Sequence, residues 1–476
     1  MKVETISLLT IFIPILGSLL VPLAGIISPR LRSIWSVLIG GLTAALPLTL
    51  IPQALKGGEI IFSKSLALGL DFILVIDPLS IFMSIVSSFI GFLIIIYSLG
   101  YMHHDENQNE YYLMVIMFIG SMMGLVYSAN LVFIYLFWEI IAIASWRLIG
   151  FYRQKDYVLK ADKAFLMTFG GAVVMLLGFI IIYGQTGTFN LVAMRGVAIP
   201  GSAVLLILFG MFSKSATVPL HTWLPDAGVA PTTVTALLHA AVLVKIGVYA
   251  YARLFLYTFK IPEGWQQAII LMAVISSLVA AGAATVENDF KRILAYSTIS
   301  QIGYIFLGLS IANPTAISGG LLYILMHGLA KAGLFLCAGI VIHSTHKRDI
   351  REMGGLIKTM PITAISFLIC AFSVIGLPPL GGFFSKLLVI LGTVQANQVW
   401  VAALALFTAV LTMFYLMRVF ALVFLGDLKI SAPEKTTSMV GVVSVLAVLS
   451  ILAGLFIAYP MKLVQMATTQ ISWWLK

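Results

Sequence analysis

Charged residues are scarce in this sequence, and their scarcity excludes a soluble protein. Only 10% of the 476 residues are Asp, Glu, Lys or Arg, against about a quarter in soluble proteins. Hydrophobic residues make up 61%, with a mean hydropathy of +1.08. Apolar runs such as VSVLAVLSILAGLFIAYP do not alternate polar and apolar residues, which excludes a membrane β-barrel. We therefore expect an all-α polytopic membrane protein.

Cysteine is also scarce, and this limits redox chemistry. Cys337 and Cys370 lie in separate apolar stretches without metal-ligand spacing, so we expect them to face lipid or to pack within the protein. The sequence has no Cys cluster for iron–sulfur ligation, no plausible pair of haem ligands and no dinucleotide motif. We expect no metal and no cofactor in this chain. Whether it belongs to an enzyme stays open, because a redox partner could carry the catalysis.

Basic residues exceed acidic ones and give a formal net charge of +10. Nucleic-acid binding is one interpretation, but these residues crowd short loops, as the positive-inside bias requires. We expect the cytoplasmic loops of a plasma-membrane protein to carry Arg30, Arg32, Arg153, Lys155, Lys160, Lys163, Lys291, Arg292, Lys347, Arg348, Arg351, Lys358, Lys429 and Lys435. The opposite loops carry Lys56, Lys64, Arg195 and Lys260. This arrangement places both termini outside.

Apolar runs, read with a window of about 19 residues, predict about fourteen transmembrane helices. They are expected near 5–27, 33–53, 72–99, 111–129, 130–149, 164–183, 203–223, 230–256, 266–286, 294–310, 317–343, 360–395, 401–425 and 437–459. The twelfth span is too long for one helix and contains GLPPLGG, which should break it. The first span lacks a basic segment and a cleavage site, so we interpret it as a retained helix. Residues 460–476, with Trp473 and Trp474 as anchors, are expected along the membrane surface.

Ionisable residues inside apolar runs are costly to bury and mark functional sites by default. Glu139, in LVFIYLFWEIIAIASW, has no basic neighbour in sequence, so its partner must come from another helix. A structural ion pair is the alternative to a functional carboxylate.

Lys214 lies in an apolar run just before Pro219, which breaks the helix and frees backbone carbonyl groups. Broken helices at membrane depth line wet cavities or are packed in protein. Burial penalises the ammonium form, whereas a nearby carboxylate stabilises it. We predict that Lys214 relays protons, with snorkelling as the alternative. His221, just after Pro219, is a further relay candidate.

Two more apolar runs contain His and Lys. His239 and Lys245 lie six residues apart and do not share a helix face. Lys245 is the better relay candidate, since His239 could equally hydrogen-bond a neighbouring helix. His327 and Lys331 are spaced i,i+4 and share a face. Because histidine titrates near neutral pH, we interpret this pair as a relay step, with a structural polar contact as the alternative.

Lys386 follows a second proline break, at Pro378 and Pro379. A lysine thus accompanies a break in the seventh and again in the twelfth predicted helix. Inverted repeats with matching broken helices are typical of transporters, so an internal repeat is expected. Charged residues nearer helix ends are expected to be structural, namely Arg147, Arg253 and Arg418 by snorkelling, Asp77 by capping a helix, and Asp226 and Asp289 at loop edges.

Several long segments resemble one known family. KSATVPLHTWLPDAGVAPTTVTALLHAAVLVKIGVYAYAR, ENDFKRILAYSTISQIGYI, HGLAKAGLFLCAG and HKRDIREMGGLIKTMPITA are similar to the antiporter-like subunits of respiratory complex I (chains L, M and N), of multisubunit Na⁺/H⁺ antiporters and of energy-converting membrane hydrogenases. The resemblance covers nearly the whole chain. The lack of a long lateral C-terminal helix favours M, N or antiporter-D-like forms, and GVAPTTVTALLHA looks closer to hydrogenase-related complexes.

The resemblance implies a fold and a set of site residues. The fold would have fourteen helices with two inverted five-helix repeats, broken in helices 7 and 12. We expect a single membrane domain, 1–476, with three N-terminal helices in 1–110, repeats in 111–257 and 266–425, and the last helix and tail in 437–476. The family's ionisable residues match Glu139, Lys214, Lys245, His327 and Lys386. Protons would move along a hydrated line towards Lys386, with Glu139 tuning Lys214.

The expected function is proton translocation in a redox-driven respiratory complex of the energy-converting hydrogenase or complex I type. The partners would be other membrane subunits and peripheral redox subunits that carry the cofactors, and no nucleic acid. The alternative is a subunit of a multisubunit Na⁺/H⁺ antiporter without a redox partner, in which Na⁺ also moves. A structural anchor that has lost transport is a third hypothesis, but an anchor gains nothing from buried charge.

Overall fold

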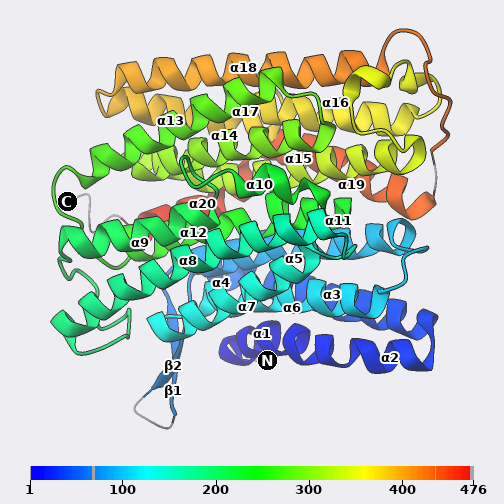
Figure 1. Cartoon of the computed structure of the whole chain (residues 1–476). Helices are drawn as coiled ribbons and strands as arrows, with labels where there is room; N and C mark the ends of the chain where they lie inside the picture. Colours follow the sequence, from blue (N-terminus) through cyan, green and yellow to red (C-terminus); the bar gives the residue numbers. More distant parts are fainter. Residues whose placement is uncertain (1, 67–69, 435, 472–476) are drawn as a thin grey trace.

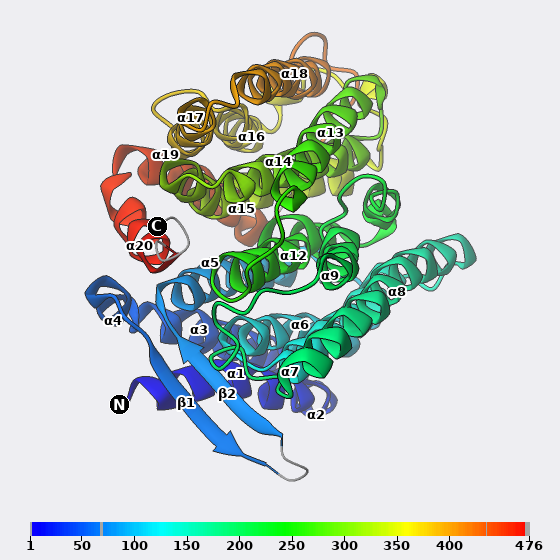
Figure 2. The same cartoon turned by 90° about the vertical axis from the view of Figure 1, so that its left-hand side faces the viewer.

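The computed structural model describes residues 2–66, 70–434 and 436–471. Most of this chain is helical, and the long helices run roughly side by side across the molecule (Figure 1). A narrow β-hairpin projects at one end, as Figure 2 shows most clearly. Lys435, Trp473 and Trp474, for which the sequence predicted a loop position and membrane anchoring, lie outside the described residues.

The N-terminal part combines helices with the hairpin. Its elements are α1 (Val3–Leu19), α2 (Val21–Ile27), α3 (Pro29–Leu48), α4 (Ile51–Lys56), β1 (Ile60–Ser65), β2 (Asp71–Ile76) and α5 (Pro78–Tyr101). The first predicted span is bent by 42° between α1 and α2.

The hairpin corrects the all-α prediction. β1 and β2 pair antiparallel, from Ile60 opposite Ile76 to Ser65 opposite Asp71, where the sequence predicted a helix from residue 72. The segment DFILVI is rich in β-branched and aromatic residues, which favour a strand. The helix begins only at Pro78, because Asp77 caps it by accepting a hydrogen bond of 2.8 Å from the backbone N–H of Ser80.

Two series of helices follow the N-terminal part. The first contains α6 (Gln108–Tyr127), α7 (Leu131–Ile149), α8 (Lys155–Thr186), α9 (Gly201–Lys214), α10 (Trp223–Asp226), η2 (Ala227–Val229), α11 (Thr232–Ala236), η3 (Leu237–Ala241), α12 (Leu243–Tyr251) and η4 (Ala252–Leu256). The second contains α13 (Trp265–Val286), α14 (Phe290–Ser310), α15 (Pro314–Thr345), η5 (Ile350–Glu352), η6 (Leu356–Lys358), α16 (Pro361–Ile375), α17 (Gly381–Gln395) and α18 (Val399–Phe424). The last elements of the described chain are α19 (Thr437–Leu455) and α20 (Ala458–Ile471).

The helix lengths fit a polytopic membrane protein. Among the described residues, eleven helices are long and apolar enough to cross a membrane, or twelve if α1 and α2 form one span. Three shorter apolar helices, α9, α16 and α17, lie beside the proline-containing breaks. The predicted break in 360–395 is confirmed, since α16 ends at Ile375 and α17 begins at Gly381. The seventh predicted helix ends earlier than expected, at Lys214.

The two series share backbone contacts at matching places. Asn130, before α7, forms an antiparallel bridge with Asn190, after α8. Asp289, before α14, forms the same bridge with Asp349, after α15, at the same sequence separation. The third helix of each series, α8 and α15, has 32 residues. In each series the next α-helix, α9 or α16, ends at a proline-containing break.

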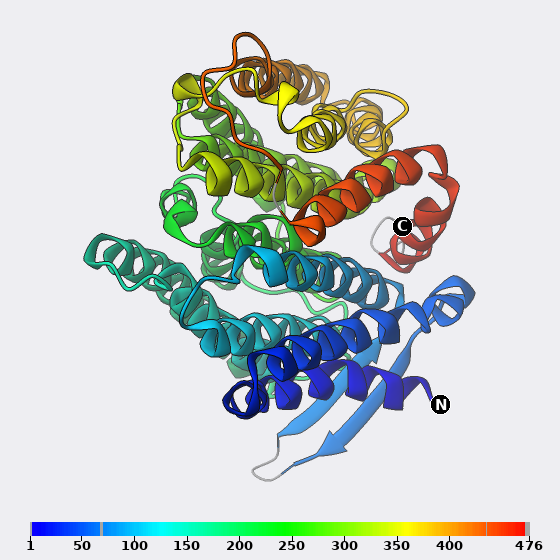
Figure 3. The same ribbon diagram turned by 90° about the vertical axis from the view of Figure 1, so that its right-hand side faces the viewer.

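The bundle has two distinct ends. The hairpin face carries β1 and β2, the loops with Arg195 and Lys260, and α20, whose Gln470 donates to the carbonyl oxygen of Gly58. The opposite end, seen in Figure 3, is called the basic face here. Its loops and helix ends carry Arg30, Arg153, Lys155, Lys163, Arg292, Lys347, Arg348, Arg351, Lys358 and Lys429. The basic loops predicted to lie on one side therefore do so within the described chain.

The core lies along the middle of the bundle. The rod from α11 to η4 is buried except for Leu256 at its end, and the most apolar stretches of α14 and α15 are almost entirely buried. Cys337 on α15 and Cys370 on α16 are both inaccessible to solvent, so they pack within the protein and do not face lipid. The central helices also carry most of the predicted relay residues.

Candidate functional site

The predicted relay residues lie in the interior of the bundle. Lys214, Lys245, His327 and Lys331 are fully buried, and Lys386 is 4% exposed. They come from α9, α12, α15 and α17, and Glu139 comes from α7. Helix packing therefore gathers ionisable groups that are far apart in sequence.

Glu139 and Lys214 form the first part of the site. Both carboxylate oxygens of Glu139 are inaccessible to solvent, and the carboxylate interacts with the hydroxyl of Tyr135 on the same helix. The Nζ atom of Lys214 donates to the carbonyl oxygen of Trp138 at 3.3 Å and lies 5.7 Å from the centre of its ring. Glu139 and Lys214 interact electrostatically without an ion pair within 4.0 Å among the described contacts. A pair held apart in this way can respond to a change of charge on either member.

Side chains of neighbouring segments satisfy the backbone at the break after Lys214. The carbonyl oxygen of Ser213 accepts from the indole N–H of Trp223 at 3.0 Å, and the N–H of Val218 donates to Ser276 Oγ at 3.1 Å. The hydroxyl of Ser215 donates to the carbonyl oxygen of Val244, next to Lys245. The residues at the break thus connect the end of α9, which carries Lys214, to α12, which carries Lys245.

Lys245 is buried without a hydrogen-bond partner for its Nζ atom in the described chain. This atom lies against Gly328, where a Cβ would come within 2.5 Å of it. His327, the residue before Gly328, interacts electrostatically with Lys245, and neither of its ring nitrogens has a partner there. A glycine at 328 therefore lets α15 bring His327 next to the lysine of α12.

His239 lies in the π-helical segment η3, beside the same cluster. The centre of its ring lies 4.5 Å from that of Phe335 on α15, with the two rings tilted by 35°, and both ring nitrogens are buried without a hydrogen-bond partner in the described residues. The alternative predicted for His239, a hydrogen bond to a neighbouring helix, is therefore wrong. It lies close enough to Lys331 to interact with it electrostatically, which places it beside the relay candidates.

A series of side-chain hydrogen bonds leads from Lys331 towards Lys386. Lys331 Nζ donates to Ser297 Oγ at 2.6 Å, and that oxygen lies 2.7 Å from the Tyr415 hydroxyl. The hydroxyl of Tyr415 donates to Thr412, which also accepts from the amide of Gln301. Gln301 Oε1 accepts from the Tyr323 hydroxyl at 2.6 Å. We call Ser297, Gln301, Tyr323, Thr412 and Tyr415 the polar path.

Lys386 is held at the far end of the polar path. Its Nζ atom donates to the carbonyl oxygen of Val374 at 2.8 Å, at the end of α16. The Tyr323 hydroxyl oxygen lies 3.3 Å from the same carbonyl oxygen. The rings of Tyr304 and Tyr323 lie 4.9 Å and 5.5 Å from Lys386 Nζ, which stabilises its charged form. The break between α16 and α17 thus supplies the carbonyl group that holds this lysine.

The sequence prediction missed the residues of the polar path. Ser, Thr, Gln and Tyr occur in apolar helices for many reasons, and only the packing of α14 against α15 and α18 joins them. The stretch STISQIGY within α14 was the available signal, because it puts several polar side chains in one buried helix.

Arg253 corrects another prediction. Snorkelling was expected, but Arg253 is 4% exposed and pairs with Asp77 through two hydrogen bonds of 2.6 Å and 2.9 Å. It also donates to the Tyr249 hydroxyl at 3.0 Å. The predicted cap by Asp77 is confirmed, and the same carboxylate neutralises a buried guanidinium.

The remaining predicted residues have structural contacts. Arg418 donates to the backbone oxygens of Thr285 and Glu287, at the end of α13. Arg147 pairs with Glu110 at the end of α7. Asp226 pairs with Lys163 and Arg292, and Asp289 caps α14 and pairs with Arg348, which confirms the prediction for both aspartates. His221 is half-buried after the break and lies 3.3 Å from the carbonyl oxygen of Pro219.

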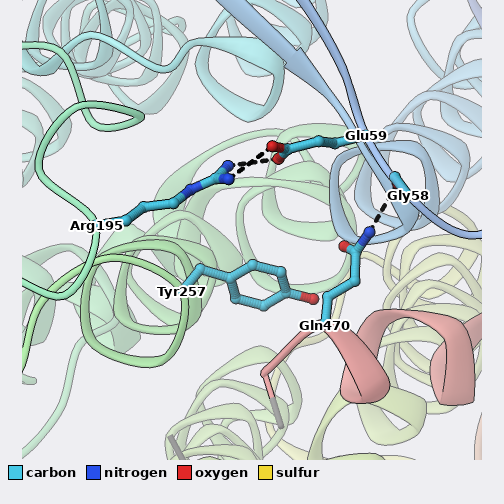
Figure 4. A pocket seen from close by; sticks show the side chains of 5 residues that line it. All are labelled: Gly58, Glu59, Arg195, Tyr257 and Gln470. Carbon is cyan, nitrogen blue, oxygen red and sulfur yellow. Dashed lines mark hydrogen bonds and ion pairs between the residues drawn. The ribbon is translucent and has the colours of Figure 1, made fainter. Parts of the chain in front are cut away.

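A surface hollow of about 390 Å³ opens on the hairpin face. It is lined by Gly58, Glu59, Arg195, Tyr257 and Gln470. Figure 4 shows Arg195 pointing at Glu59 and Gln470 reaching Gly58. Because its charged groups neutralise each other, this hollow has no free charge for an ion and does not compete with the buried site. Among the described residues, no group of three or more His, Cys, Asp or Glu could hold a metal ion.

Two family profiles match the chain. The profile described as "NADH:quinone oxidoreductase/Mrp antiporter, TM" matches residues 128–412, and that described as "NADH-Ubiquinone oxidoreductase (complex I), chain 5 N-terminus" matches residues 63–112. The first contains every predicted relay residue from Glu139 to Lys386.

Curated relatives agree with the profiles. The chain is 36% identical over 453 residues to NAD(P)H-quinone oxidoreductase chain 5 of Picosynechococcus sp., with 88% of this chain and 67% of that protein covered. It is 32% identical over 487 residues to the A1 subunit of a Na⁺/H⁺ antiporter of Staphylococcus aureus, with 95% of this chain and 60% of that protein covered. The chain thus spans about three fifths to two thirds of the length of these two relatives. They are of the chain 5 and A1 types, whereas the sequence favoured the M, N or D types.

Solved structures share the fold over their whole length. A chain of the Mrp complex from Dietzia sp. DQ12-45-1b superimposes with a TM-score of 0.89 at 22% identity, covering 99% of this chain and 98% of that one. A chain of the membrane-bound sulfane sulfur reductase, an archaeal respiratory complex, gives 0.89 at 26%, covering 98% and 97%. A chain of complex I from Thermus thermophilus gives 0.85 at 24%, covering 98% and 99%. The protein is a multi-pass membrane protein and belongs to the family of antiporter-like membrane subunits shared by NADH:quinone oxidoreductases and Mrp antiporters.

Proposed function

We propose that the chain moves protons across the plasma membrane as a subunit of a redox-driven respiratory complex of the complex I or energy-converting hydrogenase type. The observation that carries the proposal is the buried series of ionisable groups from Glu139 to Lys386. Four lysines and two histidines in this interior region have no acidic partner in ion-pair contact in the described chain. Such unpaired groups are costly to maintain, and proton relay is the function that explains the cost.

The relay would run from Lys214 through Lys245, His327 and Lys331 to Lys386. Glu139 would tune the charge of Lys214 from the neighbouring helix, and a proton would move when a charge nearby changes. The polar path would orient Lys331 and Lys386 relative to each other. His239 and His221 are additional candidates, at the cluster and at the first break.

We infer further that the fold comprises fourteen helices, with inverted repeats in 111–257 and 266–425 between the N-terminal part, 1–110, and the last helix and tail, 437–476. Eleven long apolar helices, the bent pair α1–α2, the shorter helix α9 and the pair α16–α17 taken as one span together make fourteen in the described chain, which supports this number. The matched bridges of Asn130 with Asn190 and of Asp289 with Asp349 support the repeat. The positive-inside bias supports a cytoplasmic position for the basic face, with both termini outside.

The second candidate function is that of a subunit in a multisubunit Na⁺/H⁺ antiporter without a redox partner. The similarity to the A1 subunit of the Staphylococcus aureus antiporter, over 95% of this chain, favours it. Both functions need the same buried groups, so the driving force and the ion separate them. In either case other membrane subunits are partners, and peripheral redox subunits are partners only in the first.

The test is ion uptake by vesicles that contain the native complex, with H⁺ and Na⁺ measured separately. Lys214→Ala and Lys386→Met are compared with wild type and with Lys155→Ala, which removes an exposed lysine of the basic face. We expect uptake driven by an electron donor to fall at least about 100-fold in the first two variants and to persist in the third. Uptake that needs only an imposed Na⁺ gradient would favour the antiporter.

Assembly is checked by the yield and subunit composition of the purified complex. Normal uptake in both buried-lysine variants at intact assembly would contradict the proposal, because the chain would then be an anchor.

A further inference from the structure

Four of the seven histidines of the chain gather around one surface hollow. His103, His104, His343 and His346 line a hollow of about 560 Å³ together with Thr436 and Ser438. The hollow lies on the basic face, where α5 and α15 end and α19 begins. The helix α15 also carries His327 and Lys331 deeper in the bundle.

The chemistry of the hollow suits transient proton binding. Imidazole groups change their charge near neutral pH, and the rings of His103 and His104 lie 4.9 Å apart. The charged neighbours are Asp105, which interacts with His104, and Arg348, which interacts with Tyr101. Lys347, next to His346, is paired with Glu352. Partial burial raises the pKa of Asp105, against a smaller lowering by His104.

Polar groups lead from the hollow into the core. The ring of His343 lies 5.2 Å from that of Tyr101, which is only 9% exposed. The Tyr101 hydroxyl lies 3.1 Å from Thr232 Oγ1, at the start of α11. The hydroxyl of Thr235 donates to the carbonyl oxygen of Thr232 at 2.8 Å. The rod that contains these threonines continues into η3, which carries His239.

The environment of His239 independently indicates where this series of polar groups leads. It is fully buried, both its ring nitrogens lack a hydrogen-bond partner in the described chain, and it interacts with Lys331. A buried imidazole without partners is costly, and neither the relay lysines nor the polar path hydrogen-bonds it. It lies four residues after Thr235, one turn further along the same rod, and its interaction with Lys331 links the rod to the relay.

We propose that the hollow lined by His103, His104, His343 and His346 is a proton-collecting mouth on the basic face, which supplies the buried relay through Tyr101, Thr232 and His239. This inference rests on the proposed function, since it names the place where that relay takes up its protons. The histidines bind protons from dilute solution and hold them close to Tyr101. No bond other than those to the transferred proton forms or breaks.

The experiment compares initial rates of proton uptake in vesicles that expose the basic face to a medium of pH 8 with little buffer. One variant replaces all four histidines by Gln, which keeps their polarity but does not titrate. The matched control combines Thr436→Ala and Ser438→Ala, which removes groups of the same hollow that do not titrate. We expect the Gln variant to be about tenfold slower than wild type, the control to be unchanged, and millimolar imidazole to restore the Gln variant.

A second variant, Tyr101→Phe, tests the inward step. It keeps the ring but removes the hydroxyl that contacts Thr232, so we expect slow uptake that imidazole does not restore. Wild-type rates in both variants at low buffer, or a loss in the Gln variant that imidazole leaves unchanged, would overturn the inference. Lys331→Ala separates the two proposals: if it blocks uptake while the Gln variant behaves as wild type, only the mouth is refuted. If Lys331→Ala and the Lys214 and Lys386 variants all transport normally, the relay itself is refuted.

Discussion

The hydroxyl group of Tyr415 joins two halves of the polar path, because it lies between Ser297 and Thr412. In Tyr415→Phe, Ser297 keeps Lys331 as its hydrogen-bond donor but loses the group that fixes its orientation. A lost buried hydrogen bond is worth about 1 kcal/mol, and that amount in a barrier changes a rate about fivefold. We therefore expect roughly fivefold slower uptake in this variant, measured in vesicles under a fixed driving force.

Tyr257→Phe is the matched control for that prediction. Tyr257 is also buried and donates one hydrogen bond of 2.6 Å, to the carbonyl oxygen of Ala467, outside the polar path. Equal slowing in both variants would mean that any lost hydrogen bond impairs the protein, and the polar path would have no special role.

The buried pair of Arg253 and Asp77 gives a prediction about stability. Arg253→Met leaves the carboxylate of Asp77 buried without its partner, which should destabilise the fold by about 3–5 kcal/mol. Arg195→Met breaks the pair of Arg195 with Glu59, in which the side chains are 36% and 28% exposed, respectively. This change should lower the free energy of unfolding by at most about 1 kcal/mol. Thermal unfolding in detergent measures both, and Asp77→Asn added to Arg253→Met should recover part of the loss. Similar melting temperatures for the two single variants would contradict this ranking.

Single residues also show how far sequence reasoning reaches. Glu139, Lys214 and Lys386 could be found because a charge in an apolar run is conspicuous. Arg253 is equally charged, but its partner Asp77 lies far away in sequence, and only the packing of η4 against the start of α5 brings them together. The hydroxyl groups of the polar path carry no charge, so the sequence gives them no priority.

At the scale of elements, the breaks were predictable and the hairpin was not. The residues PP within GLPPLGG cannot continue a helix, and α16 indeed ends at Ile375. The segment 71–76 is as apolar as the helix after it, so a hydropathy window merges the two. Only the cap at Asp77 and the β-branched composition separate strand from helix.

Close contact between α12 and α15 gives a prediction at this scale. In Gly328→Ala, the added methyl group would lie only 2.5 Å from Lys245 Nζ and 2.7 Å from the side chain of Ile90. The ammonium group must leave its present position beside Gly328, so we expect uptake to fall by about tenfold or more. Gly282→Ala is the control, because nothing lies within 4 Å of its added methyl group on α13. This control should retain uptake and gain up to about 1 kcal/mol in helix stability.

The two glycine variants are compared at equal assembly. If Gly328→Ala transports as fast as Gly282→Ala, the position of Lys245 next to His327 is not needed for transport.

At the scale of the whole molecule, charged contacts on the basic face join the two helix series. Asp226, after the first break, pairs with Lys163 of α8 at 2.7 Å and with Arg292 of α14 at 2.9 Å. Arg292 in turn pairs with Glu287. The segment that follows Lys214 is thus held by both helix series. These contacts would keep the broken segment in place during the proposed proton transfer.

The pH dependence of this junction follows from Asp226. Partial burial raises the pKa of Asp226, but hydrogen bonds from Lys163 and Arg292 outweigh it, so its pKa is lowered in the folded protein. A lowered pKa stabilises the fold at every pH above the unfolded value near 4, and this stabilisation is lost only as the pH falls through the folded value. Asp226→Asn should therefore reduce stability by about 1 kcal/mol, equally at pH 8 and pH 5. Asp156→Asn, which removes an exposed carboxylate paired only with Lys160, should change it by less than about 0.5 kcal/mol. Melting temperatures of the complex across this pH range measure the loss of stability in each variant. If the melting temperatures of wild type and Asp226→Asn differ at pH 7 but not at pH 5, Asp226 titrates in this range and does not hold the two series together.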